Sequence, residues 1–144
     1  MAEPEKIIVD ASVVYKWYAE EEWSKEARSI IEDYSHGHID IASVSLMPFE
    51  VLNALRYTPD IGLLDLYTVT ESLGKLSLDI QTLEGELSKR TMENALRYGI
   101  TVYDSSYLSL GELEDAQVYT ADMKLIEKAR NTCLKHISGY HSRG

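Results

Sequence analysis

The sequence is short of cysteine, proline and long apolar runs, and each shortage excludes a class of protein. Cys133 is the single cysteine, so no internal disulfide can form, and the chain lacks a metal-binding framework of cysteine and histidine. With three prolines and no low-complexity tract, the composition is that of a globular domain. No apolar run approaches the roughly 18 residues that cross a bilayer. The acidic start, MAEPEKIIVD, lacks the positive and apolar regions of a secretory signal, so we expect a cytoplasmic protein without a membrane segment.

Basic charge is also scarce, with 14 Lys and Arg against 24 Asp and Glu and a net charge of −10. A protein that grips long duplex DNA by its phosphates normally carries a basic face, so this balance argues against broad nucleic-acid binding. It does not exclude a nuclease, because bound Mg²⁺ reverses the potential of an acidic pocket locally. A Gly-rich phosphate loop, a Walker motif and a GxSxG elbow are absent from the sequence.

The chain does contain an alternation of short apolar runs and amphipathic stretches. We expect strands at 7–9, 39–43, 100–103 and 117–120, a short strand or edge segment at 78–83, and a last strand at 134–137. We expect helices from about Ala11 and over 23–34, 45–57, 61–76, 84–98, 105–113 and 123–131. The repeated βα order predicts one α/β domain over residues 1–144, a three-layer α/β/α sandwich with a central, mainly parallel sheet.

Four acidic residues lie where these strands end or in the first turns of these helices: Asp10, Glu50, Asp104 and Asp122. The carboxyl ends of parallel strands gather at one sheet edge, so residues far apart in sequence can meet there. Carboxylates that converge in a cleft repel one another unless cations neutralise them, and Mg²⁺ takes oxygen ligands of this kind. The pattern predicts a metal-dependent phosphodiesterase, and a ribonuclease in particular, in which all four acids are catalytic and metal-binding.

Each acid also has an ordinary structural interpretation. Asp10, Asp104 and Asp122 could each cap a helix, and Glu50 would interact favourably with its helix dipole. The joint pattern favours the functional interpretation, because capping would accept Ser, Thr or Asn equally well and every one of these positions is acidic.

Three uncharged residues near the acids could orient a carboxylate or a metal-bound water: Ser12, Asn53 and Thr120. Asn53 lies three residues after Glu50 and therefore on nearly the same helix face, beside a stripe beginning at Phe49 that we expect to face the core. The two hydroxyls could equally belong to turns or caps, and Asn53 could be an exposed helical residue.

Basic and apolar residues supply candidates for partners. The candidate contacts to RNA phosphates are Lys16, Arg56, Arg90, Arg97 and Lys124, although solvation is the more common role for each such side chain. The run Glu20–Glu22 is expected to be a solvated helix start. The apolar residues of the stretch 61–76 recur around a helix that carries no chemical motif, so we expect a homodimer there, with a groove for a partner protein alongside. They are Leu63, Leu64, Leu66, Val69 and Leu73.

The segments IIVDAS, PFEVLNAL, YDSSYLSL and YTADMKL resemble, in order and spacing, the motifs of PIN-domain nucleases, and in particular of the VapC-type toxins of prokaryotic toxin–antitoxin systems. The four acids match the acidic positions of these motifs. Ser105 stands where the family often has Ala, and the segment 59–83 shows no family motif. The resemblance implies a three-layer α/β/α fold, Mg²⁺ or Mn²⁺ dependence and endonucleolytic cleavage of RNA. It also implies a homodimer, inhibited by a small antitoxin whose C-terminal segment lies over the active-site groove.

In the corresponding two-metal scheme, Asp10 and Asp104 hold the ion that activates water, Glu50 assists and Asp122 completes the site. Both one and two resting ions remain compatible with the sequence, because Mg²⁺ often keeps several waters and borrows ligands from phosphate. A PIN-fold RNA-processing nuclease without an antitoxin, and a non-catalytic binding module with the same fold, also remain open.

Two unrelated classes fit the sequence less well. A phosphoacceptor receiver domain needs an acidic pair after its first strand and a Lys near its last strands, but Ala11 follows Asp10 and no Lys stands beside Thr120. A haloacid-dehalogenase-like phosphatase needs a second Asp two residues after the first, where this chain has Ser12.

Overall fold

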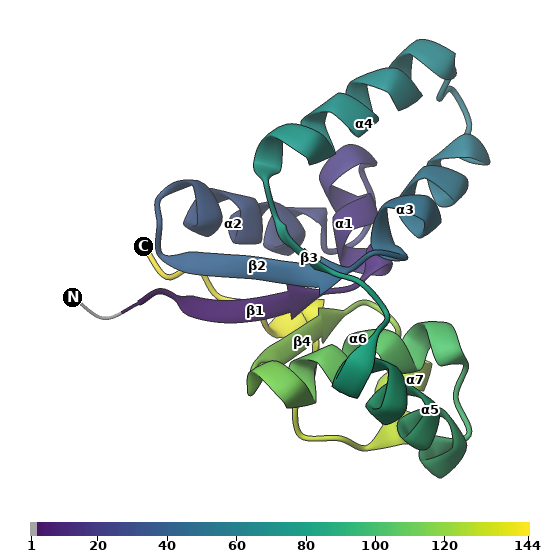
Figure 1. Ribbon diagram of the computed structural model, residues 1–144. Helices are drawn as coiled ribbons and strands as arrows, with labels where there is room; N and C mark the ends of the chain where they lie inside the picture. Colours follow the sequence, from purple (N-terminus) through teal and green to yellow (C-terminus); the bar gives the residue numbers. More distant parts are fainter. Residues whose placement is uncertain (1–2) are drawn as a thin grey trace.

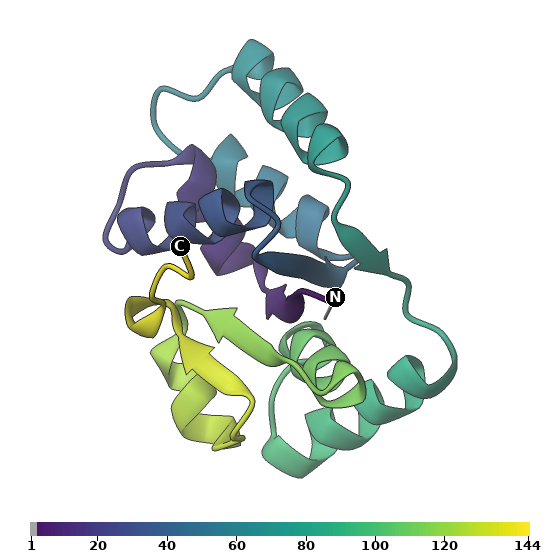
Figure 2. The ribbon, with the colours of Figure 1, turned by 90° about the vertical axis from the view of Figure 1, so that its left-hand side faces the viewer.

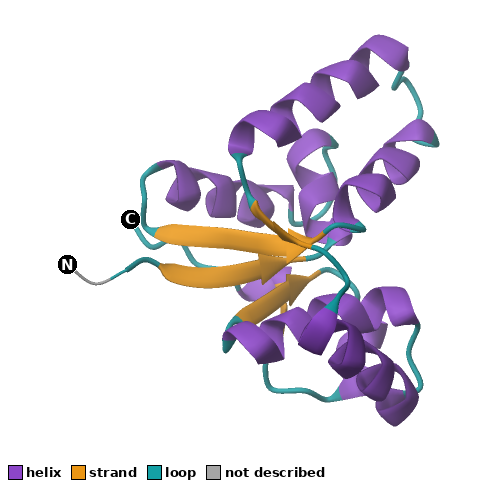
Figure 3. Ribbon diagram, in the orientation of Figure 1, coloured by secondary structure: helices purple, strands orange, loops and turns teal. Residues whose placement is uncertain are grey.

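The computed structural model describes residues 3–144, which form a five-stranded sheet between two layers of helices (Figures 1 and 3). The strands are β1 (Glu5–Val9), β2 (Ile39–Val44), β3 (Asp79–Gln81), β4 (Gln117–Thr120) and β5 (Leu134–His136). They lie in the order β3-β2-β1-β4-β5, and all four pairings are parallel. The expected α/β/α fold is therefore confirmed.

The helices divide between the two faces of the sheet. They are α1 (Ala11–Tyr18), α2 (Ser24–Ser35), α3 (Met47–Arg56), α4 (Leu63–Leu76), α5 (Gly85–Tyr98), α6 (Val102–Glu114) and α7 (Met123–Ala129), followed by the short 3-10 helix η1 (Ile137–Gly139). Figures 1 and 2 show α1 to α4 on one side of the sheet and α5 to α7 on the other, with α4 standing furthest out. No helix within residues 3–144 is long and apolar enough to span a bilayer.

The central strands are apolar because helices cover both of their faces. Ile7, Ile8 and Val9 of β1 are completely buried, and Ile41 and Ala42 of the neighbouring β2 are nearly so. A strand buried on both faces reads as a continuous apolar run, and IIV is such a run. The strands β1, β2 and β4 are parallel, and their arrowheads point the same way in Figure 1. Their carboxyl ends therefore lie at one edge of the sheet.

The expected strand at 100–103 was wrong, because α6 begins at Val102. Gly99 ends α5 in the left-handed region at φ +62, so few residues remain before Thr101 caps the next helix. The Thr101 hydroxyl oxygen accepts a hydrogen bond from the Asp104 amide at 3.0 Å. Asp104 therefore follows no strand and is not a helix cap; it lies in the first turn of α6.

The stripe expected to face the core from α3 was also partly wrong. The buried residues of this helix are Met47, Val51 and Leu55, which recur every four residues. Phe49 lies on the other side and is 75% exposed. The outer face of α3 therefore presents a large aromatic ring to solvent.

Candidate active site

Asp10 lies at the junction between β1 and α1, at the centre of the strand edge. Its Oδ1 atom accepts hydrogen bonds from the amides of Ser12 at 3.0 Å and Val13 at 3.3 Å, so it caps α1. Only 7% of the residue is exposed. Burial raises the pKa of this carboxyl to about 6, although its hydrogen bonds oppose the rise. Asp10 is therefore a helix cap, as the capping interpretation predicts. The same geometry places at the sheet edge a carboxylate whose charged form is disfavoured by burial.

Two hydroxyls join the loop after β1 to the loop after β4. Ser12 Oγ donates to Asp10 Oδ1 at 2.5 Å and accepts from the Ala121 amide at 2.8 Å. Thr120, which is completely buried, accepts from the Asp122 amide at 3.0 Å, and its hydroxyl lies 3.4 Å from that of Ser12. The structure thus places Ser12 and Thr120 in contact with the acidic loops, where they fix the Asp10 side chain.

Glu50 projects from the first turn of α3 and is held by a residue that the sequence reasoning missed. The hydroxyl of Tyr107 donates to Glu50 Oε1 at 2.6 Å, and Tyr107 is only 2% exposed. Burial and then the Glu50 carboxylate raise the pKa of Tyr107 far above its ordinary value, so the phenol stays a donor. Tyr107 lies one turn after Asp104 on α6. The three-residue spacing between Asp104 and Tyr107 in YDSSYLSL could have indicated from the sequence that Tyr107 lies near the acids.

Asp104 and Asp122 lie close enough to repel one another. Burial, and then the negative charge of Asp122, raise the pKa of the Asp104 carboxyl. Asp122 caps α7, and its Oδ1 accepts from the Leu125 amide at 3.1 Å. The capping interpretation therefore applies to Asp122. It does not apply to Asp104, because Thr101 caps α6.

The four acids form two neighbouring pairs. Asp104 lies near Asp122, and the charges of Glu50 and Asp10 both raise the pKa of Tyr107. Within residues 3–144, no three carboxylate, imidazole or thiol side chains are arranged to hold one ion between them. The donor set is all oxygen and its charges are unbalanced, which fits Mg²⁺ or Mn²⁺ bound through one or two carboxylates with waters filling the remaining positions.

The candidate cations and Asn53 differ in where they lie. Lys16 lines a hollow of about 360 Å³ that Glu50 also lines. Asn53 and Arg56 line a different hollow, of about 580 Å³, between α3 and α4. Lys124 is exposed in the first turn of α7. Arg90 and Arg97 sit on α5, the former 3.9 Å from Glu112 and the latter over the ring of Tyr98.

The run Glu20–Glu22 is exposed, as expected, but two of its residues also pair with cations. Glu20 lies 2.9 Å from Arg28, and Glu21 pairs with Lys16. Glu21 Oε1 accepts a hydrogen bond from Lys16 Nζ at 2.7 Å, and the Glu21 side chain is 42% exposed. The three glutamates precede α2 rather than begin it, because α2 starts at Ser24.

A search of protein families matches the PIN domain to residues 7–131. The chain belongs to the PIN-domain family. Within that family it is similar to Ribonuclease VapC3 of Pyrobaculum aerophilum, at 31% identity over 127 residues, 85% of this chain and 94% of the relative. Exonuclease VapC9 of the same organism is 26% identical over 128 residues, 88% of each chain. These matches confirm the resemblance to VapC-type PIN-domain proteins.

Solved structures agree on the fold. A toxin–antitoxin complex from Klebsiella pneumoniae contains a chain that superposes with a TM-score of 0.69, covering 91% of this PIN-domain chain and 97% of that one. The sequence identity is 14%, so this likeness concerns the fold alone.

Proposed function

We propose that this PIN-domain protein is a Mg²⁺- or Mn²⁺-dependent endoribonuclease and the toxin of a toxin–antitoxin pair. The observation that supports it is the placement of the acids: Asp104 lies near Asp122, and Asp10 and Glu50 both lie near Tyr107. Burial raises the pKa of Asp10 and of Asp104. The relative named Ribonuclease VapC3 supports RNA as the substrate. An RNA substrate and an antitoxin made in the same cell would place the protein in the cytoplasm.

In this proposal Asp10 and Asp104 would hold the ion directly, with Glu50 and Asp122 acting directly or through water. The bound ion would make hydroxide available near neutral pH and neutralise charge on the attacked phosphate. The chain's own groups set up the site: Ser12 fixes the Asp10 carboxylate, and the Tyr107 phenol fixes Oε1 of Glu50. One or two ions per site are compatible with this donor set.

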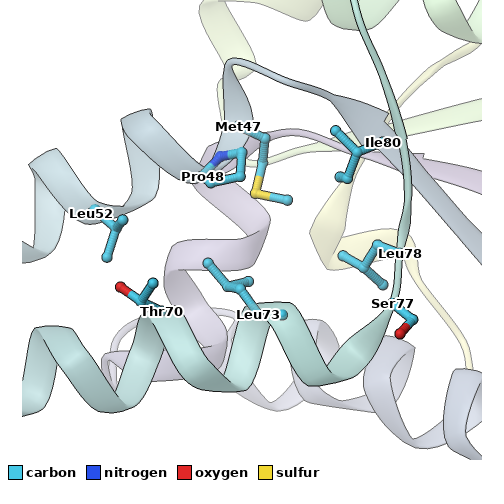
Figure 4. A pocket seen from close by; sticks show the side chains of 9 residues that line it. Met47, Pro48, Leu52, Thr70, Leu73, Ser77, Leu78 and Ile80 are labelled. Carbon is cyan, nitrogen blue, oxygen red and sulfur yellow. The ribbon is translucent and has the colours of Figure 1, made fainter.

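The partner surface in this proposal lies over α3 and α4. Phe49, Leu63, Leu64 and Tyr67 are each more than 60% exposed, and they follow the outer side of these two helices. An apolar hollow of about 320 Å³ opens between the same helices (Figure 4). Exposed apolar surface of this kind marks an interaction site. It supports an antitoxin and a second copy of the chain as partners. The similarity to a chain of the toxin–antitoxin complex from Klebsiella pneumoniae supports the antitoxin.

Not every apolar residue of α4 is available to a partner. Val69 is 7% exposed and belongs to the core, whereas Leu63 and Leu64 are 62% and 78% exposed. The start of α4 is therefore the part of the helix that we propose as the dimer contact.

Cleavage of single-stranded RNA by the purified protein tests the activity. We expect cleavage with Mn²⁺ or Mg²⁺, none after EDTA is added, and recovery when the metal is restored. A circular RNA distinguishes an endonuclease from an exonuclease, because it has no free end at which an exonuclease could begin. Cleavage of the circle shows endonuclease activity. Cleavage that survives full chelation would overturn the metal-dependent mechanism, and no cleavage with either metal would favour the non-catalytic module.

A further inference from the structure

Lys16 is a buried cation whose position calls for an explanation. It is 6% exposed, near the end of α1, and Lys is rarely so buried unless it is paired. Its partner is Glu21, at 2.7 Å. Among residues 3–144 this is the one hydrogen bond recorded for Nζ, although an ammonium group carries three donors. Glu21 therefore holds the Lys16 ammonium in place, and the other N–H donors of the ammonium can bind a ligand.

Hydrogen bonds other than this ion pair hold the loop between α1 and α2. The Glu21 amide donates to Ser24 Oγ at 3.0 Å, and Ser24 Oγ donates to the carbonyl of Ala19 at 3.0 Å. The indole of Trp17 donates to the carbonyl of Ala27 at 2.8 Å, which ties α1 to α2 directly. Three other hydrogen bonds therefore already hold this connection, and a buried ion pair often adds little net stability.

Lys16 instead faces the candidate active site across the 360 Å³ hollow. Lys16, Glu21 and Glu50 all line this hollow, yet within residues 3–144 no ion pair joins Lys16 to Glu50. Glu50 is engaged by Tyr107 and Lys16 by Glu21, so the Lys16 ammonium and the Glu50 carboxylate line the same hollow without pairing with each other. An anion bound next to the acids would find its counter-charge at Lys16.

The remaining walls suit a nucleotide. Ala11, Ala54 and Ala121 have small side chains that leave room, and Tyr15 contributes an aromatic ring. The Tyr15 hydroxyl is hydrogen-bonded to Thr58 at 2.6 Å, which fixes the ring. Aromatic side chains of this kind stack on unpaired bases. The volume lies at the small end of the range for ligand pockets, about 300–1,000 Å³, which is suited to one unpaired nucleotide.

We propose that this hollow is the subsite for the nucleotide adjoining the cleaved bond, with Lys16 binding its phosphate, Tyr15 stacking on its base and Glu21 positioning Lys16. The proposal rests on the ribonuclease function proposed above. In it, Glu21 keeps the ammonium directed at the phosphate and away from Glu50.

Binding of single-stranded RNA to a cleavage-impaired protein tests the subsite. The Asp104→Asn protein, with Mg²⁺ present, is titrated against a labelled oligoribonucleotide of about 12 nucleotides. Adding Lys16→Met should weaken binding about tenfold, as loss of one charge-assisted contact does, and should reduce the salt dependence by about 0.7 in log–log slope. Lys75→Met is the matched control, because Lys75 is an exposed lysine paired with Glu71 on α4.

The outcomes separate this subsite from the activity itself. Equal affinity and slope for the Lys16→Met and Lys75→Met proteins would overturn the subsite, as would an Asp104→Asn protein that does not bind the oligonucleotide. Absence of metal-dependent cleavage by wild type would refute the ribonuclease function, and the binding comparison would still report on Lys16.

A double-mutant cycle on KM tests the positioning role of Glu21. Glu21→Gln should raise KM for RNA in the wild-type background, and it should have no effect on KM once Lys16→Met is present, because Glu21 acts through Lys16. An equal effect in both backgrounds would show that Glu21 acts independently and would overturn this part of the proposal.

Discussion

Replacing Tyr107 with Phe removes a single oxygen, the one that donates to Glu50 Oε1 at 2.6 Å. The ring is 2% exposed and stays packed, so the change isolates the hydrogen bond. A hydrogen bond to a charged group contributes about 1.5–3 kcal/mol. Because Glu50 is only partly buried, water replaces much of the lost bond, and we expect the free energy of unfolding to fall by about 1 kcal/mol.

The effect on activity should be larger than the effect on stability. Groups that orient a metal ligand typically change metal affinity or activity by about 10- to 100-fold when they are removed. We therefore expect a loss of this size in kcat or in apparent Mn²⁺ affinity for Tyr107→Phe. The assays are urea unfolding, RNA cleavage across a Mn²⁺ titration, and RNA binding, which should change little because Tyr107 faces Glu50 rather than the hollow.

Tyr119→Phe is the matched control for this experiment. It also removes a buried tyrosine hydroxyl, but that hydroxyl donates to Gln117 at 3.3 Å, within β4 itself. A Tyr107→Phe protein with the metal affinity and cleavage rate of the control would refute the idea that this phenol fixes Glu50 for catalysis.

Two further predictions concern stability. Asp33→Asn should lower the free energy of unfolding by about 1.5–3 kcal/mol at neutral pH, because the buried carboxylate accepts from the Tyr140 hydroxyl at 2.5 Å and the Arg143 amide at 2.8 Å. Burial raises the pKa of Asp33, but these hydrogen bonds outweigh it and hold the pKa below its ordinary value. The stabilisation is present above the unfolded-state pKa of about 3.9 and is lost as the pH falls through the folded-state value, so unfolding curves of the two proteins should converge in acid. Gly111→Ala should cost about 1–3 kcal/mol in urea unfolding, because the added Cβ would collide with the side chain of Val118.

The fold could be predicted from the sequence because its signals are local. The run Ile7–Val9 is apolar throughout, and an acid, Asp10, follows it directly. In the same way, Asp122 follows two residues after the end of β4. The segment 100–103 misled because Ile, Thr, Val and Tyr favour strands, whereas Thr101 also favours a helix cap. The motif thus made Asp104 a candidate site residue, although the strand predicted just before it was wrong.

The parts of the site that were missed depend on tertiary contacts. Tyr107 reads as an ordinary core residue on α6 until the structure places Glu50 opposite its hydroxyl. Asn53 is one turn from Glu50, but the packing of α3 between α1 and α4 turns it toward α4, while Ala54 faces the hollow beside Glu50. The orientation of a helix about its axis depends on its neighbours, and a local pattern does not determine it.

The most direct test of the metal-dependent account is the thermal stability of the Asp104→Asn protein with and without Mn²⁺. Thr101, not Asp104, caps α6, and Asp104 is repelled by Asp122, so the metal-free variant should be as stable as wild type or more stable. Mn²⁺ should raise the melting temperature of wild type, because a ligand that binds only the folded state stabilises it, and most of that increment should disappear in the variant along with RNA cleavage. A variant that keeps both the full Mn²⁺-induced shift and full cleavage would contradict the assignment of Asp104 as a metal ligand.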